Sequence, residues 1–166
     1  EISGLVVEMQ GCGEYLKSCM AKYTLPLSKE RERICDFRIH IKRCTEIPMP
    51  VGMSLTDSGI WHMVQTERGE SVYRTFPGMP DVVSARIDFL EDCAEISFFS
   101  FEESDVETRE LFLSGQAFSQ LLLPYRRIVL HSSCIAKDGR AVLFSAPSGT
   151  GKSTHTGLWK KYYPDT

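Results

Sequence analysis

The chain has 166 residues, of which 42% are apolar and 25% are charged, which excludes a collagen-like, disordered or disulfide-stapled protein. No apolar run approaches the roughly 20 residues of a membrane span, so we expect no membrane contact. The formal charge is +1 over residues 1–50, −9 over 51–125 and +5 over 126–166, and an acidic middle argues against a nucleic-acid partner.

The first half of the chain mixes strand and helix patterns. Residues 2–9 contain a short apolar run typical of a strand, and residues 14–23 repeat apolar side chains at helical spacing. Residues 37–41 alternate apolar and polar side chains, which predicts a half-buried strand. Residues 48–80 carry four prolines and four glycines, so we expect mostly loop there, with one short strand over 72–75.

The second half contains clearer signals. Residues 82–90 and 94–101 form two β-rich runs that predict a hairpin, and residues 107–123 predict a helix ended by Pro124. We expect Leu111, Phe112, Phe118, Leu121 and Leu122 to line its apolar face, with Glu107 and Glu110 in its first turn. Asp138-Gly139 predicts a two-residue turn between strands over 128–136 and 140–146.

These elements predict an α+β fold with two parts. Residues 1–125 form a mixed amino-terminal domain of strands and two or three helices. Residues 126–166 form a hairpin, a loop and a helix, which is the start of a P-loop α/β core. The last helix carries an apolar stripe of Leu158, Trp159, Tyr162 and Tyr163, which we expect to be partly exposed or buried against a neighbouring molecule.

The loop carries the chemistry. It follows the phosphate-binding pattern G-x-x-x-x-G-K-[ST], with Ala in place of the first Gly. Such glycines let successive N–H groups point at an anion, the lysine offers a charge to the β and γ phosphates, and the serine hydroxyl binds Mg²⁺. We therefore expect ATP and Mg²⁺ as ligands, with Lys152 as a catalytic residue and Ser153 as the metal ligand. The nucleotide-binding residues are Ala146, Pro147, Ser148, Gly149, Thr150, Gly151, Lys152, Ser153 and Thr154.

Residues 130–154 resemble the start of the kinase core in HPr kinase/phosphorylase-like proteins, which also looks like the nucleotide end of phosphoenolpyruvate carboxykinase. The resemblance covers about 30 residues. It implies an ATP-dependent phosphotransferase that acts on a protein or peptide hydroxyl, and it implies a catalytic or phosphate-contacting role for His131. A strand histidine bonded to a backbone carbonyl is the plainer interpretation of His131.

The resemblance also implies a longer core. In that family the core continues to acidic residues that hold Mg²⁺ and move protons, whereas the printed chain ends at Thr166. We therefore expect the 166 residues alone to lack turnover. Two other functions stay open: a nucleotide- or phosphate-sensing module without catalysis, and a carboxykinase-type enzyme that acts on a small acid.

Several other residues have plain structural interpretations. Six cysteines without C-x-x-C spacing and without a leader predict reduced thiols in a cytoplasmic protein, with Cys134 packed as a small apolar side chain. His40 and His62 lack partners at zinc-ligand spacing, and His155 is expected to be neutral, in the first turn of the last helix. The acidic residues over 102–110 are expected to be a solvated loop and helix start, and self-association into a homo-oligomer stays open.

Overall fold

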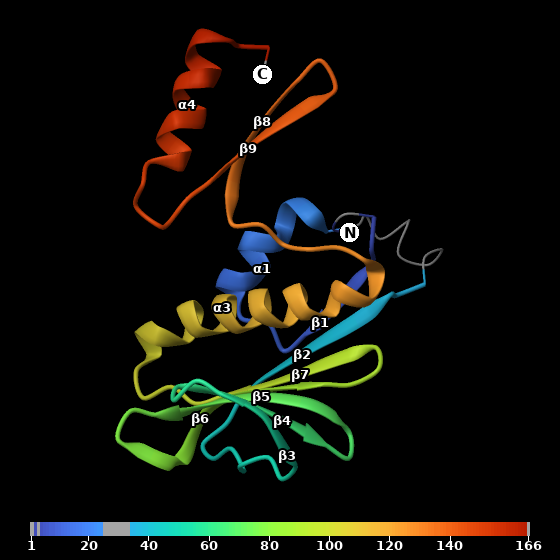
Figure 1. The fold of residues 1–166 in the computed structure, drawn as a ribbon, viewed down its shortest axis with the longest axis vertical. Coiled ribbons are helices and arrows are strands. Elements are labelled where there is room, and N and C mark those ends of the chain that lie inside the picture. The colour runs from blue at the N-terminus through green and yellow to red at the C-terminus, as the bar shows by residue number, and fades with distance from the viewer. Residues whose placement is uncertain (1, 3, 25–33, 166) are drawn as a thin grey trace. The chain divides into compact units, whose positions relative to one another are not determined.

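The computed structural model describes residues 2, 4–24 and 34–165, and the chain divides into two compact units, Glu1–Arg126 and Arg127–Thr166. The first unit combines a large sheet with helices, and the second combines a hairpin with one helix (Figure 1). The α+β class predicted from the sequence is confirmed. No helix in the described part of the chain is both long and apolar enough to cross a membrane.

The first unit is built on a seven-stranded sheet in the order β1-β2-β7-β6-β5-β4-β3. Strands β1, β2 and β7 run parallel, whereas β3 to β7 form an antiparallel meander. The strands are β1 (Val7–Gln10), β2 (Phe37–Arg43), β3 (Met53–Asp57), β4 (Trp61–Thr66), β5 (Gly69–Phe76), β6 (Met79–Phe89) and β7 (Cys93–Phe98).

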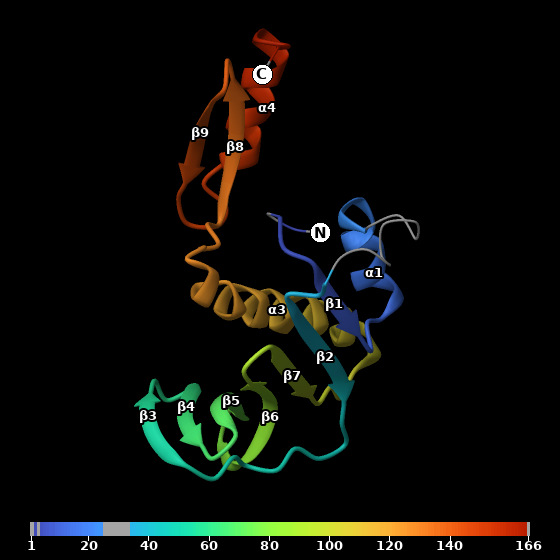
Figure 2. The same ribbon diagram turned by 90° about the vertical axis from the view of Figure 1, so that its right-hand side faces the viewer.

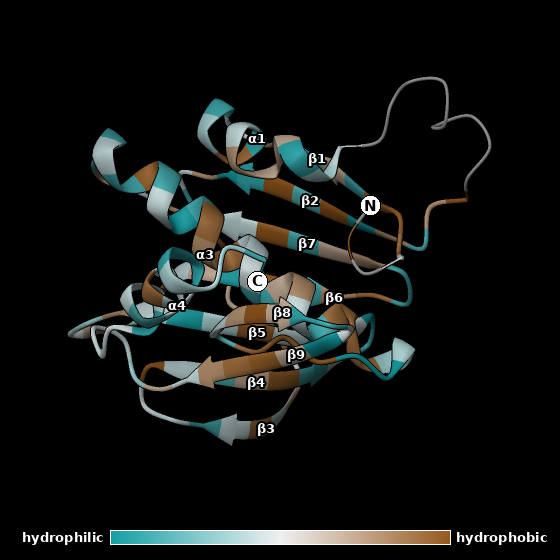
Figure 3. Cartoon of the chain, turned by 90° about the horizontal axis from the view of Figure 1, so that it is seen from above, coloured by the Kyte–Doolittle hydropathy of each residue, from teal (hydrophilic) through white to brown (hydrophobic). Residues whose placement is uncertain are grey.

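One face of this sheet holds the core. Helices α1 (Glu14–Met20) and α3 (Glu103–Leu121) lie on that face in both views (Figures 1 and 2), followed by the 3-10 turns η1 (Ala21–Tyr23) and η2 (Leu123–Tyr125). In β2 the alternation places Phe37, Ile39 and Ile41 in the core and the residues between them on the other face. Figure 3 shows this alternation of apolar and polar residues along β2.

The expectation of a loop over residues 48–80 is wrong. This stretch contains β3, β4, β5 and the start of β6. Its glycines occupy the turns: Gly59 and Gly78 have φ of 78° and 77°, which the left-handed region allows glycine without strain. Pro48 and Pro50 lie in the connection between β2 and β3. Proline and glycine thus mark the ends of short strands here, rather than the absence of strands.

The connection over residues 44–52 crosses the face of the sheet opposite α3, as Figure 2 shows. Ile47 and Pro50 are buried in it. Arg86, which lies between the core residues Ala85 and Ile87 and so points to this face, donates from Nη1 to the carbonyl oxygen of Pro48 over 3.0 Å. The connection therefore covers part of a face that would otherwise be open to water.

The buried face of helix α3 agrees only in part with the prediction. The helix begins at Glu103, four residues before the predicted start. Leu121 and Leu122 are buried and Phe118 packs against the core, as expected, whereas Leu111 and Phe112 are exposed. The buried positions within the helix follow a stripe that includes two polar residues, which counting apolar residues could not detect. These buried positions are Glu110, Leu113, Ser114, Ala117 and Leu121. Glu110 is not in the first turn, and it is 4% exposed.

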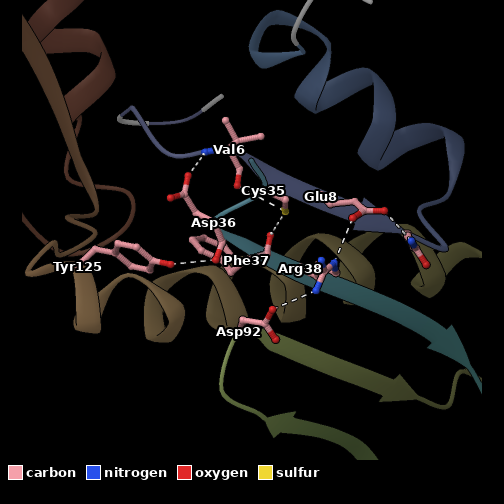
Figure 4. Close-up of polar contacts among 9 residues, drawn as sticks. Val6, Glu8, Cys35, Asp36, Phe37, Arg38, Asp92 and Tyr125 are labelled. Carbon is pink, nitrogen blue, oxygen red and sulfur yellow. Dashed lines mark hydrogen bonds and ion pairs between the residues drawn. The ribbon is translucent and has the colours of Figure 1, made fainter. Parts of the chain in front are cut away.

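Polar contacts fix the edge of the sheet at β1 (Figure 4). The Asp36 carboxylate accepts the Val6 N–H at 2.7 Å, and the Tyr125 hydroxyl donates to the Asp36 carbonyl at 2.9 Å. Arg38 bridges Glu8 and Asp92 at 3.3 and 3.0 Å. These contacts tie β1, β2 and the turn before β7 to the segment that follows α3.

The second unit consists of β8 (Ser132–Lys137), β9 (Arg140–Ser145) and α4 (Lys152–Tyr162). Asp138 and Gly139 have φ of 51° and 72°, and the predicted two-residue turn is confirmed. The strand predicted over 128–136 is too long at its start, because this turn sets a register in which Ser132 pairs with Ser145, the last residue of β9. Residues 128–131 therefore have no strand partner in β9.

Candidate phosphate-binding site

The loop between β9 and α4 lies in the setting that the motif requires. The strand ends at Ser145, the loop covers residues 146–151, and the helix begins at Lys152. Gly149 and Gly151 have φ of 81° and 84°, and Gly151 is the N-cap of α4. Nothing lies within 4 Å of a Cβ built at either glycine, so the backbone conformation, and not crowding, is the reason for glycine at these positions.

Lys152 turns back toward the loop that precedes it. Its Nζ donates to the carbonyl oxygens of Ala146 at 2.7 Å and Pro147 at 3.1 Å. Thr150 Oγ1 donates to the same Pro147 carbonyl at 2.8 Å. The loop is therefore closed on itself by side chains, with the ammonium group at its start.

The start of α4 is suited to an anion. The first hydrogen bond of the helix runs from the His155 N–H to the Gly151 carbonyl at 2.9 Å, so the N–H groups before it have no acceptor within the helix. No acidic residue lies in the first turn of α4, so nothing there offsets the partial positive charge of the helix terminus. The loop residues 146–151 carry no carboxylate either.

The polar side chains after Lys152 differ in exposure. Ser153 and Thr154 are exposed, so the Ser153 hydroxyl is available as a ligand for a metal ion. Thr156 is buried and bonds through Oγ1 to the carbonyl oxygens of Ser153 and Lys152, at 3.0 and 3.4 Å. Ser153 and Thr154 thus belong to the candidate site, whereas Thr156 stabilises the helix start.

His131 lies just before β8, where the strand pairing ends. It is exposed, and its carbonyl oxygen accepts a bond of 3.5 Å from Ser145 Oγ. Ser145 is the last residue before the loop, so the His131 backbone lies beside the loop entrance. Strand alternation continued back from Ile135 and Ser133 would place His131 on the face that α4 covers.

His155 has a packing role. Its ring lies edge-on to Phe144 of β9 with centroids 4.6 Å apart, and its Nε2 accepts the indole N–H of Trp159 at 3.2 Å. His155 therefore joins α4 to the hairpin.

One residue in the hairpin differs from expectation. Cys134 is exposed, not packed, because α4 covers the opposite face of β8, where Ile135 is buried. The apolar stripe at the end of the chain is partly exposed, as expected. Leu158, Tyr162 and the C-cap residue Tyr163 are 49%, 68% and 51% exposed, whereas Trp159 is half-buried.

A buried carboxylate in the first unit was missed by the sequence interpretation. Glu110 Oε1 accepts the N–H of Gly13, the N-cap of α1, at 2.6 Å. A Cβ on Gly13 would lie 2.7 Å from Glu110 Oε2, so a larger residue at this position would have to displace the Glu110 carboxylate. Only the Gly-Cys-Gly sequence before a predicted helix could have suggested a tight turn, and nothing in it pointed to a carboxylate partner.

In the described ranges, the thiols and the other potential metal ligands form no further candidate site. All six cysteines are free. Burial raises the pKa of the Cys12 and Cys93 thiols, and nearby carboxylates, Glu110 beside Cys12 and Glu95 beside Cys93, raise the pKa values further. Among the described residues no three His, Cys, Asp or Glu side chains come close enough together to hold a metal ion.

Comparisons of the chain with protein-family models, with curated proteins and with solved structures returned no match. The candidate site therefore stands on its own geometry.

Proposed function

We propose that residues 146–154 bind the phosphates of ATP together with Mg²⁺, and that the chain belongs to a phosphotransferase resembling the HPr serine kinases. The acceptor in this proposal is the hydroxyl of a protein or peptide. One observation carries it: Lys152 and two left-handed glycines shape a closed loop between a strand and a helix N-terminus. This combination meets the steric and electrostatic needs of a phosphate chain.

Each group has a separate role in this proposal. The N–H groups at the start of α4 donate to phosphate oxygens, and Lys152 exchanges its contacts with the Ala146 and Pro147 carbonyls for the β and γ phosphates. Ser153, whose hydroxyl is exposed, is the protein ligand of Mg²⁺. Bound Mg²⁺ would neutralise charge that develops on the phosphates during transfer. His131, beside the loop entrance, is assigned to the acceptor side.

Calorimetric titration of the full 166-residue chain with Mg-ATP tests the binding step. Lys152→Ala should weaken binding by roughly 10- to 150-fold, because it removes charge-assisted hydrogen bonds worth about 1.5 to 3 kcal/mol. Lys160→Ala is the matched control, since Lys160 lies in the last turn of the same helix, and it should leave the affinity within about twofold.

The outcomes separate the candidate functions. Equal affinity of the unchanged chain and Lys152→Ala would contradict nucleotide binding by this loop. The transfer step is tested with a longer chain that includes further core residues. If nucleotide binding depends on Lys152 but this longer chain transfers no phosphate to any serine-containing protein, a nucleotide-sensing module is favoured over a kinase.

A further inference from the structure

The first unit exposes a group of phenylalanine rings at one end of its sheet. Phe76 is the last residue of β5, and Phe99 and Phe101 follow the end of β7. The turn after β5 and the turn after β7 lie at the same end of the sheet (Figure 1). The ring centroids are 4.6 Å apart for Phe99 and Phe101, 5.2 Å for Phe76 and Phe101, and 5.8 Å for Phe76 and Phe99. We call these three residues the phenylalanine cluster. Phe101 is its outermost member, 76% exposed.

The backbone beneath Phe101 is held in place by neighbouring groups. The Phe99 N–H donates to the Ser84 carbonyl at 3.0 Å, and Arg109 donates to the Phe99 carbonyl at 3.0 Å. Arg43 donates to the Ser100 carbonyl at 3.4 Å, and the Ser100 hydroxyl donates to the Glu102 carbonyl at 2.7 Å. An exposed aromatic side chain on a fixed turn loses little backbone freedom when a partner binds, which is typical of energetically important contact residues.

Three carboxylates lie close to the phenylalanine cluster along the chain. Glu102 follows Phe101 directly, Asp105 lies four positions after Phe101, and Asp81 lies two residues after Met79, the register partner of Phe76. All three are exposed, and within the described part of the chain none of them forms an ion pair. Two arginines also lie beside the cluster: Arg43 pairs with Glu103 at 2.6 Å, and Arg109 donates to the Phe99 carbonyl. The pairing of Arg43 with Glu103 leaves the three other carboxylates in excess over Arg109. The surface around Phe101 is therefore acidic.

The ring geometry limits the kind of cation that fits. A cage for a methylated ammonium needs a space between the rings, whereas these rings are in contact with one another. The cluster therefore presents outer ring faces and edges, which suit an aliphatic side chain and the flat or elongated stem of an arginine or lysine. Exposed Met79 and Val82 extend the apolar area beside it.

From these observations we infer that the phenylalanine cluster is a docking surface for a basic polypeptide segment, one that carries lysine or arginine next to apolar side chains. The apolar side chains pack on Phe101, and the basic groups pair with Glu102, Asp105 and Asp81. This surface belongs to the first unit alone, so the inference does not depend on nucleotide binding by the loop.

Selection from random phage-displayed peptides of about 12 residues on the immobilised 166-residue chain tests this inference. Enriched peptides should carry lysine or arginine close to leucine, isoleucine or an aromatic residue. A synthetic copy of an enriched peptide, titrated by fluorescence anisotropy, should bind less tightly as NaCl rises from about 50 to about 300 mM, because the added salt screens the charge pairs.

Variants then locate the contact. Phe101→Ala should weaken peptide binding about tenfold, and Glu102→Lys about fivefold. Phe101 is so exposed that its removal should leave the circular dichroism spectrum unchanged. Phe112→Ala, an exposed ring outside the cluster, and Glu67→Lys, in the turn at the opposite end of β5, should each stay within about twofold of the unchanged chain.

Three outcomes would overturn the inference: no enrichment, enriched peptides without basic residues, or binding that Phe101→Ala does not weaken. A fourth would replace the partner. If the chain alone forms dimers in sedimentation experiments and Phe101→Ala dissociates them, the occupant of the surface is a second copy and not a separate basic segment.

Discussion

The Nζ of Lys152 lies 2.7 Å from the carbonyl oxygen of Ala146, six positions earlier in the chain. This bond joins the first residue of α4 to the first residue after β9, so it closes the loop between them. The ammonium group is thereby held beside the helix N-terminus, where a bound phosphate would meet both charges. The sequence motif gives the residue types of the loop, and this contact brings its first residue, Ala146, next to the side chain of Lys152.

The position of His131 can be tested with a paramagnetic nucleotide complex. If His131 serves the acceptor side of the loop, Mn-ATP should broaden its imidazole proton signals in the NMR spectrum of the 166-residue chain. The spectrum of His131→Ala assigns those signals. If the amide signals of Gly149 and Gly151 broaden while the imidazole signals of His131 stay sharp, a role for His131 near the phosphates is contradicted.

Glu110 should contribute to the stability of the first unit. Glu110→Ala removes the acceptor of the Gly13 N–H and should lower the free energy of unfolding by about 1.5 to 3 kcal/mol, measured by urea titration. Glu107→Ala, an exposed carboxylate on the same helix, is the control and should change it by less than about 0.5 kcal/mol. Equal effects of the two substitutions would show that the Glu110 contact does not stabilise the fold.

The thiols of half-buried Cys12 and buried Cys93 predict a stability that falls in alkali. The fold raises the pKa of Cys12 and Cys93, so the folded chain keeps thiol protons that the unfolded chain releases above about pH 8.5. The stabilisation is fully present below that pH and is lost as pH rises toward the folded-state pKa. The urea midpoint should therefore fall between about pH 7.5 and pH 9.5, and it should fall less in Cys93→Ala. An equal fall of the urea midpoint in the unchanged chain and in Cys93→Ala would argue against a contribution from Cys93.

The second unit could be predicted well from the sequence because its signals are local. Asp138-Gly139 sets the turn and thereby the register of β8 and β9, and the glycines of the loop lie next to the helix that they cap. The start of β8 was placed too early, because apolar residues 128–130 suit a strand but find no partner in β9, and Cys134 was expected on the packed face of β8.

The first unit could be predicted less well because its structure depends on distant contacts. The parallel pairing of β1, β2 and β7 joins segments that no turn connects. The contact between Glu110 and Gly13 spans 97 positions, so the helix pattern alone could not tell that this carboxylate is buried. The prolines and glycines over 48–80 indicated turns, but sequence alone did not show how short the strands between those turns are.

Backbone-amide NMR during titration of the 166-residue chain with Mg-ATP tests whether the loop over residues 146–151 binds nucleotide phosphates. We predict that the largest chemical-shift changes occur at the amides of residues Gly149, Gly151, Lys152 and Ser153. At an ATP concentration near the Kd of the unchanged chain, Lys152→Ala should strongly reduce the changes at the glycine and Ser153 amides. If ATP leaves these amides unshifted, or if the changes are equally large in Lys152→Ala, phosphate binding by this loop is contradicted.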